Sequence, residues 1–210
     1  METNYWAASY LAHATLRLWL RPASSKSDQT GPEPKPRHFI ITSSVICFAG
    51  LAGYAPYAVA KSALRSLADN LRQEMNLYNG YRAANPDKGP AADVKIHCVV
   101  PGTITSPGFE EENRVKHPVT KKLEESDPRQ NEDEVAVAAV RGLEKGGYLI
   151  TTQWLAHIMR ASALGGSPRN NAFTDTILGW ISYVVWLFVG PDLESKVFNY
   201  GETHEVALPQ

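Results

Sequence analysis

The chain has 210 residues, of which 43% are hydrophobic and 20% are charged, a length that supports one compact domain. Its 21 lysines and arginines nearly balance 22 acids at a formal net charge of -1, which excludes a strongly basic nucleic-acid binder because no excess of cations exists to neutralise phosphates. The two cysteines, Cys47 and Cys98, are too few for a disulfide-dense scaffold or a four-thiolate zinc site.

The first half of the chain predicts two helices and one strand. Apolar residues at helical spacing predict a helix over 5–20 and another over about 56–77. Between them, the proline-rich stretch 21–37 predicts a surface loop, and 38–43 (HFIITS) predicts a buried strand. A Gly, Pro and Asn-rich connection is predicted at 79–92. The apolar face of the first helix is expected to consist of Ala7, Tyr10, Leu11, Ala14 and Leu18.

The second half begins with 93–100 (DVKIHCVV), a run that becomes continuously apolar, as is typical of a strand in a parallel sheet. Residues 131–145 predict a helix with acids in its first turn and a glycine just beyond its end. Two uncharged runs, 146–159 and 176–191, predict two buried or partly buried helices. Each is shorter than the roughly 20 apolar residues that cross a bilayer. The second is also rich in Trp and Tyr, which favour membrane interfaces, so membrane association of this run stays open.

A tyrosine, a lysine and a serine stand at a spacing suited to reducing a ketone. Tyr57 and Lys61 are four residues apart and therefore share one face of the predicted helix. A nearby cation favours the phenolate and brings the phenol pKa of about 10 toward neutral pH, where it is a useful general acid. Ser44, thirteen residues before Tyr57, could hydrogen-bond the carbonyl oxygen as charge builds on it. The alternative is a stray lysine on an amphipathic surface helix.

These residues and their surroundings resemble the short-chain dehydrogenase/reductase family. The resemblance runs through 40–74 (IITSSVICFAGLAGYAPYAVAKSALRSLADNLRQE) and 94–109 (VKIHCVVPGTITSPGF), where a strand ends in Pro-Gly. It implies four catalytic residues: Ser44, Tyr57, Lys61 and, before the strand, Asn4. It implies that NADPH is bound by Tyr57, Lys61, Pro101, Gly102 and Ile104. Ser43 and Tyr54 lie close to these positions but are not expected to be catalytic, because neither has the spacing that the family motif requires.

Within this family, 101–125 is most similar to reductases that act on sphingoid ketones. The similarity implies NADPH-dependent reduction of the 3-keto group of a long-chain sphingoid ketone, in sphingolipid biosynthesis at the cytosolic face of the endoplasmic reticulum membrane. A homo-oligomer is compatible with it. An aliphatic substrate is also consistent with the aromatic run lying against a membrane.

The resemblance implies an α/β fold, the C-terminal portion of a Rossmann-type doubly wound parallel sheet with C-terminal apolar helices. We divide the chain into a partial reductase domain, 1–147, with 21–37 as a Pro/Ser-rich loop, and an apolar, membrane-associated extension, 148–210. No Gly-x-Gly turn is present to bind a pyrophosphate. We therefore expect a truncated chain with weak NADPH binding and an aggregation-prone sheet edge. The alternative is a catalytically inactive short product, a membrane-associated interaction module or pseudoenzyme.

Other kinds of site have little support in the sequence. The six histidines are scattered without metal-ligand spacing, so we expect no metal site. No Gly-x-Ser-x-Gly elbow surrounds Ser44, which argues against a serine hydrolase. The pair Lys121 and Lys122 is too small a patch to bind nucleic acid.

Overall fold

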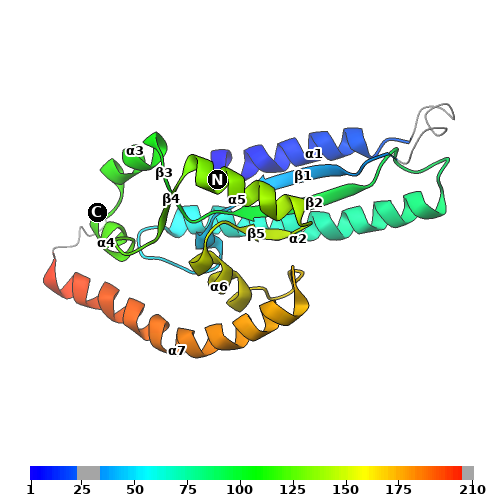
Figure 1. Ribbon diagram of the computed structural model, residues 1–210. Helices are drawn as coiled ribbons and strands as arrows, with labels where there is room; N and C mark the ends of the chain where they lie inside the picture. Colours follow the sequence, from blue (N-terminus) through cyan, green and yellow to red (C-terminus); the bar gives the residue numbers. More distant parts are fainter. Residues whose placement is uncertain (23–33, 205–210) are drawn as a thin grey trace.

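The computed structural model describes residues 1–22 and 34–204 and has the predicted α/β organisation (Figure 1). Most of the predicted loop 21–37 lies outside the described residues. The helices of the structure are a π-helix Glu2–Trp6, α1 Ala7–Trp19, a 3₁₀ helix Val45–Cys47, α2 Ala55–Ala84, α3 Pro107–Val115, α4 Pro118–Leu123, α5 Glu132–Glu144, α6 Trp154–Ser162 and α7 Ala172–Thr203. Its strands are β1 Arg37–Thr42, β2 Val94–Val100, β3 Thr103–Thr105, β4 Arg129–Asn131 and β5 Leu149–Thr151.

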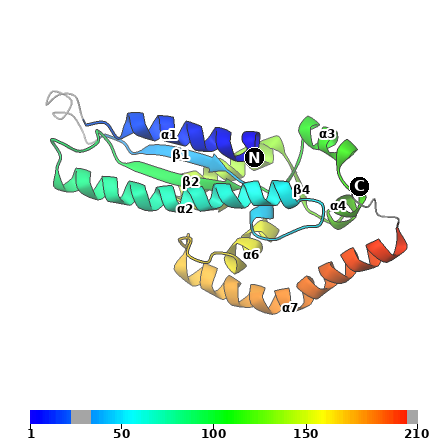
Figure 2. The same ribbon diagram turned by 180° about the vertical axis from the view of Figure 1, so that it is seen from behind.

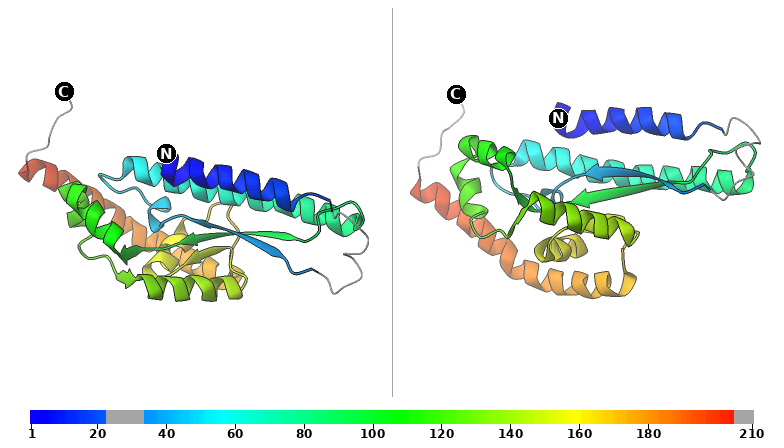
Figure 3. Two further views of the ribbon diagram at one scale, coloured as in Figure 1. Left: turned by 90° about the horizontal axis from the view of Figure 1, so that it is seen from above. Right: turned by 45° about the horizontal axis from the view of Figure 1, so that its top comes forward.

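The main sheet has three parallel strands in the order β1-β2-β5, which confirms the expected parallel sheet. Helices α1 and α2 cover one face of it and α5 lies on the other (Figure 3), while α6 lies next to the edge formed by β5. Strands β3 and β4 form a separate parallel pair. The core sits between the sheet and the α1–α2 layer, where Leu64, Val94 and Val100 are almost completely buried.

The predicted apolar face of the first helix is wrong. Its large members Tyr10, Leu11 and Leu18 are 67%, 62% and 58% exposed, whereas Ala12 and Leu16 are buried. The face that packs against the core carries Ala8, Ala12, Leu16 and Trp19, so it is offset from the predicted face. Apolar residues occur on both faces of this helix, and spacing alone therefore does not determine which one is buried.

Helix α2 continues through 79–84, where the sequence predicted a connection. Its last turns are attached to the start of β2: Asn79 donates a hydrogen bond to the Val94 carbonyl and accepts one from the Val94 amide. Arg82 forms a salt bridge with Asp93 at 3.0 Å. These contacts compensate for the low helix propensity of Asn79 and its neighbouring glycine.

The run 146–159 is not one helix, as predicted, but a strand followed by a helix. Leu149–Thr151 pairs with β2 as β5, and α6 begins at Trp154. Strand β5 therefore belongs to the main sheet although it follows residue 147. A strand forms here because all three side chains are buried and the backbone pairs with β2 in the parallel sheet.

Helix α7 extends well beyond the uncharged run 176–191 in both directions and reaches 32 residues. It runs beneath α6 as one long, bent helix (Figure 2), with Pro191 inside it. By length and composition it is one helix that could cross a membrane, with a mean hydropathy of 1.5 over its most apolar 18 residues and only 17% of them buried. It packs first against α6 and then against α4.

Candidate active site

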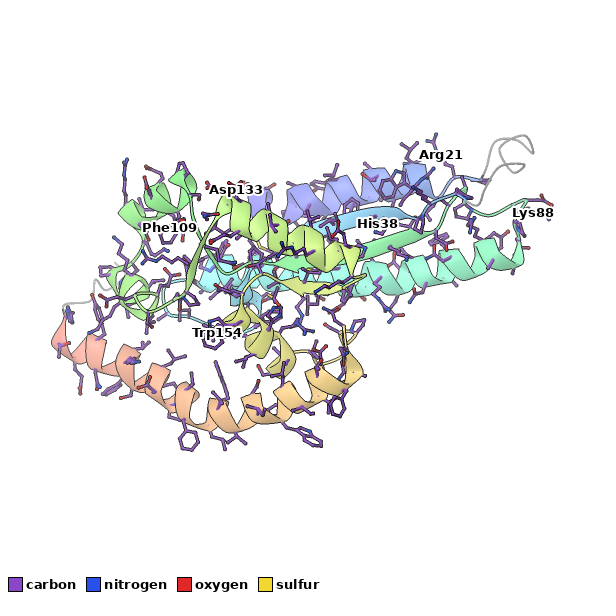
Figure 4. All side chains as sticks on the ribbon, viewed as in Figure 1. Arg21, His38, Lys88, Phe109, Asp133 and Trp154 are labelled. Atoms are coloured by element: carbon purple, nitrogen blue, oxygen red, sulfur yellow. The ribbon has the colours of Figure 1, made fainter. Side chains whose placement is uncertain are left out.

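A cavity of about 1040 Å³ lies at the carboxyl ends of β1 and β2, the edge of a parallel sheet where ligands of such folds bind. Helices α3 and α6, marked by Phe109 and Trp154 in Figure 4, border it together with α7. The structure brings six of the seven predicted site residues to its wall: Ser44, Tyr57, Lys61, Pro101, Gly102 and Ile104.

The Tyr57 phenol lies between the two partners that the sequence predicted. Hydrogen bonding with Ser44 lowers its pKa, but burial is the larger effect, and the pKa is raised from its ordinary value. The Lys61 ammonium lies 5.5 Å from the Tyr57 ring centroid, and burial lowers its own pKa. Burial is therefore the larger influence on the Tyr57 pKa in this chain, and the role of Lys61 as the cation that favours the phenolate stays a prediction.

The serine that precedes Ser44 has a different environment. Ser43 is buried, and its hydroxyl donates a 2.8 Å hydrogen bond to the backbone carbonyl of Lys61. One residue later, the Val45 amide donates to the Pro101 carbonyl at 3.0 Å. The two hydrogen bonds fix the backbone on both sides of Ser44, to α2 and to the end of β2, so that the Ser44 hydroxyl is held at the cavity wall.

Tyr54 joins this site to the α3–α4 segment, a connection that the sequence analysis missed. Its hydroxyl donates a 2.7 Å hydrogen bond to Glu112, and its ring centroid lies 5.4 Å from that of Tyr57. The buried Lys116 ammonium contacts Glu112 at 3.1 Å and Glu124 at 2.7 Å. It also lies 5.2 Å from the Tyr54 ring centroid. We call these four residues the lid cluster, because α3 and α4 border the cavity.

Asn4 is the predicted site residue that does not line the cavity. It lies in the π-helix Glu2–Trp6, which contacts α2. Short π-helical segments occur frequently at functional sites. The catalytic role of Asn4 stays a prediction.

Gln153, which the sequence analysis also missed, lies where the nicotinamide end of a cofactor is expected. It is the N-cap of α6 but makes no capping hydrogen bond, and its buried Oε1 has no partner within the described residues. The Gln153 amide lies against Gly102, where it occupies the space that a Cβ would take, so a larger residue at 102 would require this side chain to move. An open cavity wall beside an unpaired amide oxygen is compatible with a carboxamide-bearing nicotinamide ring. No cluster of metal-binding side chains is found among the described residues.

The chain is similar in sequence to curated reductases. No protein-family model matches the chain. A 3-ketodihydrosphingosine reductase of Aspergillus fumigatus is 52% identical over 211 residues, covering 100% of this chain and 57% of the relative. One from Neurospora crassa is 38% identical over 95% of this chain and 51% of its own length. The chain thus spans about half the length of these curated relatives. A short-chain dehydrogenase structure from Burkholderia cenocepacia, in complex with NADP, aligns with a TM-score of 0.42 at 18% identity, over 60% of this chain and 43% of that one.

Proposed function

We propose that this chain, a sequence relative of the 3-ketodihydrosphingosine reductases, carries the catalytic part of an NADPH-dependent reductase. Its reaction is the conversion of 3-ketodihydrosphingosine to dihydrosphingosine in sphingolipid biosynthesis. The observation that carries the proposal is the placement of Ser44, Tyr57 and Lys61 together on the wall of one large cavity.

The site residues divide the work of reducing the ketone. Ser44 donates a hydrogen bond to the carbonyl oxygen and stabilises the negative charge that develops there. Tyr57 donates the proton that converts this oxygen to a hydroxyl, and the Lys61 ammonium stabilises the phenolate that is left. Bound NADPH supplies the hydride that the carbonyl carbon accepts. Ketone, hydride and proton together give the secondary alcohol.

The rest of the cavity suits a ligand with a long alkyl chain. Apolar side chains from three elements contribute to its wall, including Phe109 of α3, Met159 of α6 and Val189 of α7, and charged side chains of α4 and α7 such as Lys122 and Lys196 line it as well. A site with apolar walls and polar groups can hold an amphiphilic small molecule, with the alkyl chain on the apolar part. Such a substrate resides in membranes, which supports our proposal that the protein acts at the cytosolic face of the endoplasmic reticulum membrane.

The test is a reduction assay on this chain joined to the part of the Aspergillus fumigatus relative that lies outside its match, a protein that we call the chimera. We expect the chimera to consume NADPH and form dihydrosphingosine, identified by mass spectrometry. The Tyr57→Phe variant should lose about 10²- to 10⁴-fold in turnover, the range for a general acid, while still binding NADPH. Unchanged turnover in the variant would disprove the proton-donor role.

A second candidate function is a membrane-associated interaction module without catalysis. The observation that favours it is the large exposed apolar surface of α7, in a sequence without a Gly-x-Gly phosphate turn. A folded chimera that binds vesicles but neither binds NADPH nor reduces the ketone would favour this candidate over the reductase.

A further inference from the structure

The two long faces of α7 have different surroundings. One row, at three- and four-residue spacing, is buried against α6 at Asp175, Gly179 and Ser182. The same row continues toward the C-terminus as Trp186, Val189 and Leu193, which line the active-site cavity. The inner face of α7 therefore packs against α6 in the first half of the helix and lines the active-site cavity in the second half.

The outer face of α7 is apolar and open. Phe173, Trp180, Val184 and Leu187 follow one another at spacings that share a face, and they are 74%, 70%, 59% and 71% exposed. The neighbouring Phe188 is 73% exposed. No charged residue lies between Asp175 and Asp192, so this face has apolar and aromatic side chains without the charges that normally keep a helix surface in water.

Both ends of α7 are attached to the same globular body. At the first turn, Asp175 forms a buried ion pair with Arg160 of α6, at 2.9 and 2.5 Å. Ser182 then donates a hydrogen bond to the Ile158 carbonyl. In the last turns, the Tyr200 ring lies 5.5 Å from the ammonium of Lys122 on α4. A helix held at both ends by one body cannot pass through a bilayer, because its two ends would have to emerge on opposite sides.

We propose that α7 lies in the plane of the membrane, with its outer face in the acyl region of one leaflet and its inner face closing the cavity. The occupant of the exposed face is a lipid bilayer. Trp180 and Tyr183 have the aromatic side chains that are enriched at membrane interfaces, and the helix is uncharged from 176 to 191, with its charged residues confined to Asp175 and the turns from Asp192 onward. The proposal rests on the proposed function, since the cavity behind the helix is the one assigned to an aliphatic substrate.

This placement gives the substrate a short path. The cavity lies about one helix diameter, roughly 10 Å, from the acyl chains of the leaflet. A long-chain ketone can then move from the bilayer around α7 to Tyr57 without exposing its alkyl chain to water, which is unfavourable for every methylene group.

The first test is flotation of the chain with phosphatidylcholine vesicles, comparing two leucines of equal exposure. Leu187→Glu changes the outer face of α7, and the matched control Leu77→Glu changes a site on α2 that is 72% exposed. We expect the α7 variant to bind vesicles about tenfold or more weakly, because a charge in the acyl region is costly, and the α2 variant to bind like the parent. Equal effects of the two changes would overturn the proposal.

The second test measures the orientation of the helix. Thr174→Cys and Glu202→Cys place thiols near the two ends of α7, and vesicle-bound protein is treated with a membrane-impermeant maleimide, with labelling of the parent as background. In-plane α7 exposes both thiols, so both should react. Protection of one end would show a spanning helix and overturn the proposal. Neither test contains ketone or NADPH, so a negative result leaves the reductase proposal intact, and the chimera assay in detergent tests that function separately.

Discussion

At the scale of single residues, Ser43 and Ser44 form a natural pair of controls. Ser44→Ala removes the donor to the developing oxyanion, so we expect the chimera to lose about 10²- to 10³-fold in kcat with little change in unfolding free energy. Ser43→Ala removes the side-chain hydrogen bond that ties Ser43 to the Lys61 carbonyl of α2. It should lower the free energy of unfolding by about 0.5–1.5 kcal/mol and leave kcat of the folded enzyme within a few-fold.

Steady-state kinetics and urea unfolding of the two variants measure the two effects separately. The reverse pattern, with Ser43 controlling turnover and Ser44 controlling stability, would contradict the assignment. The two variants are informative because Ser43 and Ser44 are adjacent, and an assignment from sequence spacing could be wrong by one residue.

Asp175 offers a second prediction for a single residue. Its carboxylate pairs with the buried Arg160 and accepts hydrogen bonds from the Asn170 and Asn171 amides. Burial alone would raise the Asp175 pKa, but these partners together lower it below the ordinary value. Asp175→Asn leaves Arg160 buried without a counter-charge. We expect it to lower the free energy of unfolding by about 3–5 kcal/mol at neutral pH.

The pH dependence of this contribution has a definite sign. A carboxyl with a lowered folded-state pKa stabilises the protein fully above its ordinary pKa of about 3.9, and the stabilisation is lost as the pH falls through the folded-state value. The difference in unfolding free energy between parent and Asp175→Asn should therefore be constant near neutral pH and shrink below about pH 4. Urea titrations at several pH values measure it, and a difference that grew in acid would refute the assignment.

At the scale of elements, the contacts of the lid cluster predict that α3 and α4 open together with the start of α2. Lys116 holds both Glu112 and Glu124, and Tyr54 links Glu112 to the start of α2. Lys116→Met leaves the two carboxylates without their shared cation. We expect faster amide hydrogen exchange in both 107–124 and 51–57, because the two segments are held by the same contacts.

Lys116→Arg keeps the charge and is the control for that experiment. It should exchange at rates closer to the parent than Lys116→Met does. Faster exchange confined to 107–124 would mean that the lid is not coupled to the helix that carries Tyr57.

The spacing of residues along the chain predicted those elements and site residues that depend on neighbours close in sequence. It did not predict those that depend on contacts with residues far away in the sequence. Ser44, Tyr57 and Lys61 could be found because their spacing lies within one strand, turn and helix. Gln153 could not, because its neighbour Gly102 is remote in sequence, and the contact of Lys116 with Tyr54 likewise joins distant positions. The same reason explains β5, whose three residues become a strand only because β2 is beside them. It also explains α1, which has apolar residues on both faces and buries the one that meets the core.

At the scale of the whole molecule, the parallel sheet directs the carboxyl ends of β1 and β2 toward the cavity, so the proposed catalytic and nicotinamide-binding residues lie in the segments that follow these strands. A dinucleotide also needs a glycine-rich turn at a helix N-terminus for its pyrophosphate, and the sequence has no Gly-x-Gly. In our proposal the chain thus contains groups for one end of the cofactor and lacks the motif for the other.

This division predicts a ratio of affinities. Reduced nicotinamide mononucleotide has the nicotinamide end of NADPH but not the adenosine half. Because the 210-residue chain has no glycine-rich turn for the pyrophosphate, we expect it to bind both compounds weakly, with Kd values within about threefold of each other. The chimera, which adds the remaining part of the relative, should bind NADPH at least about 100-fold more tightly than the mononucleotide. Fluorescence titration measures all four constants. A chain that already favoured NADPH 100-fold would contain a phosphate site elsewhere, and the division of the cofactor site would be wrong.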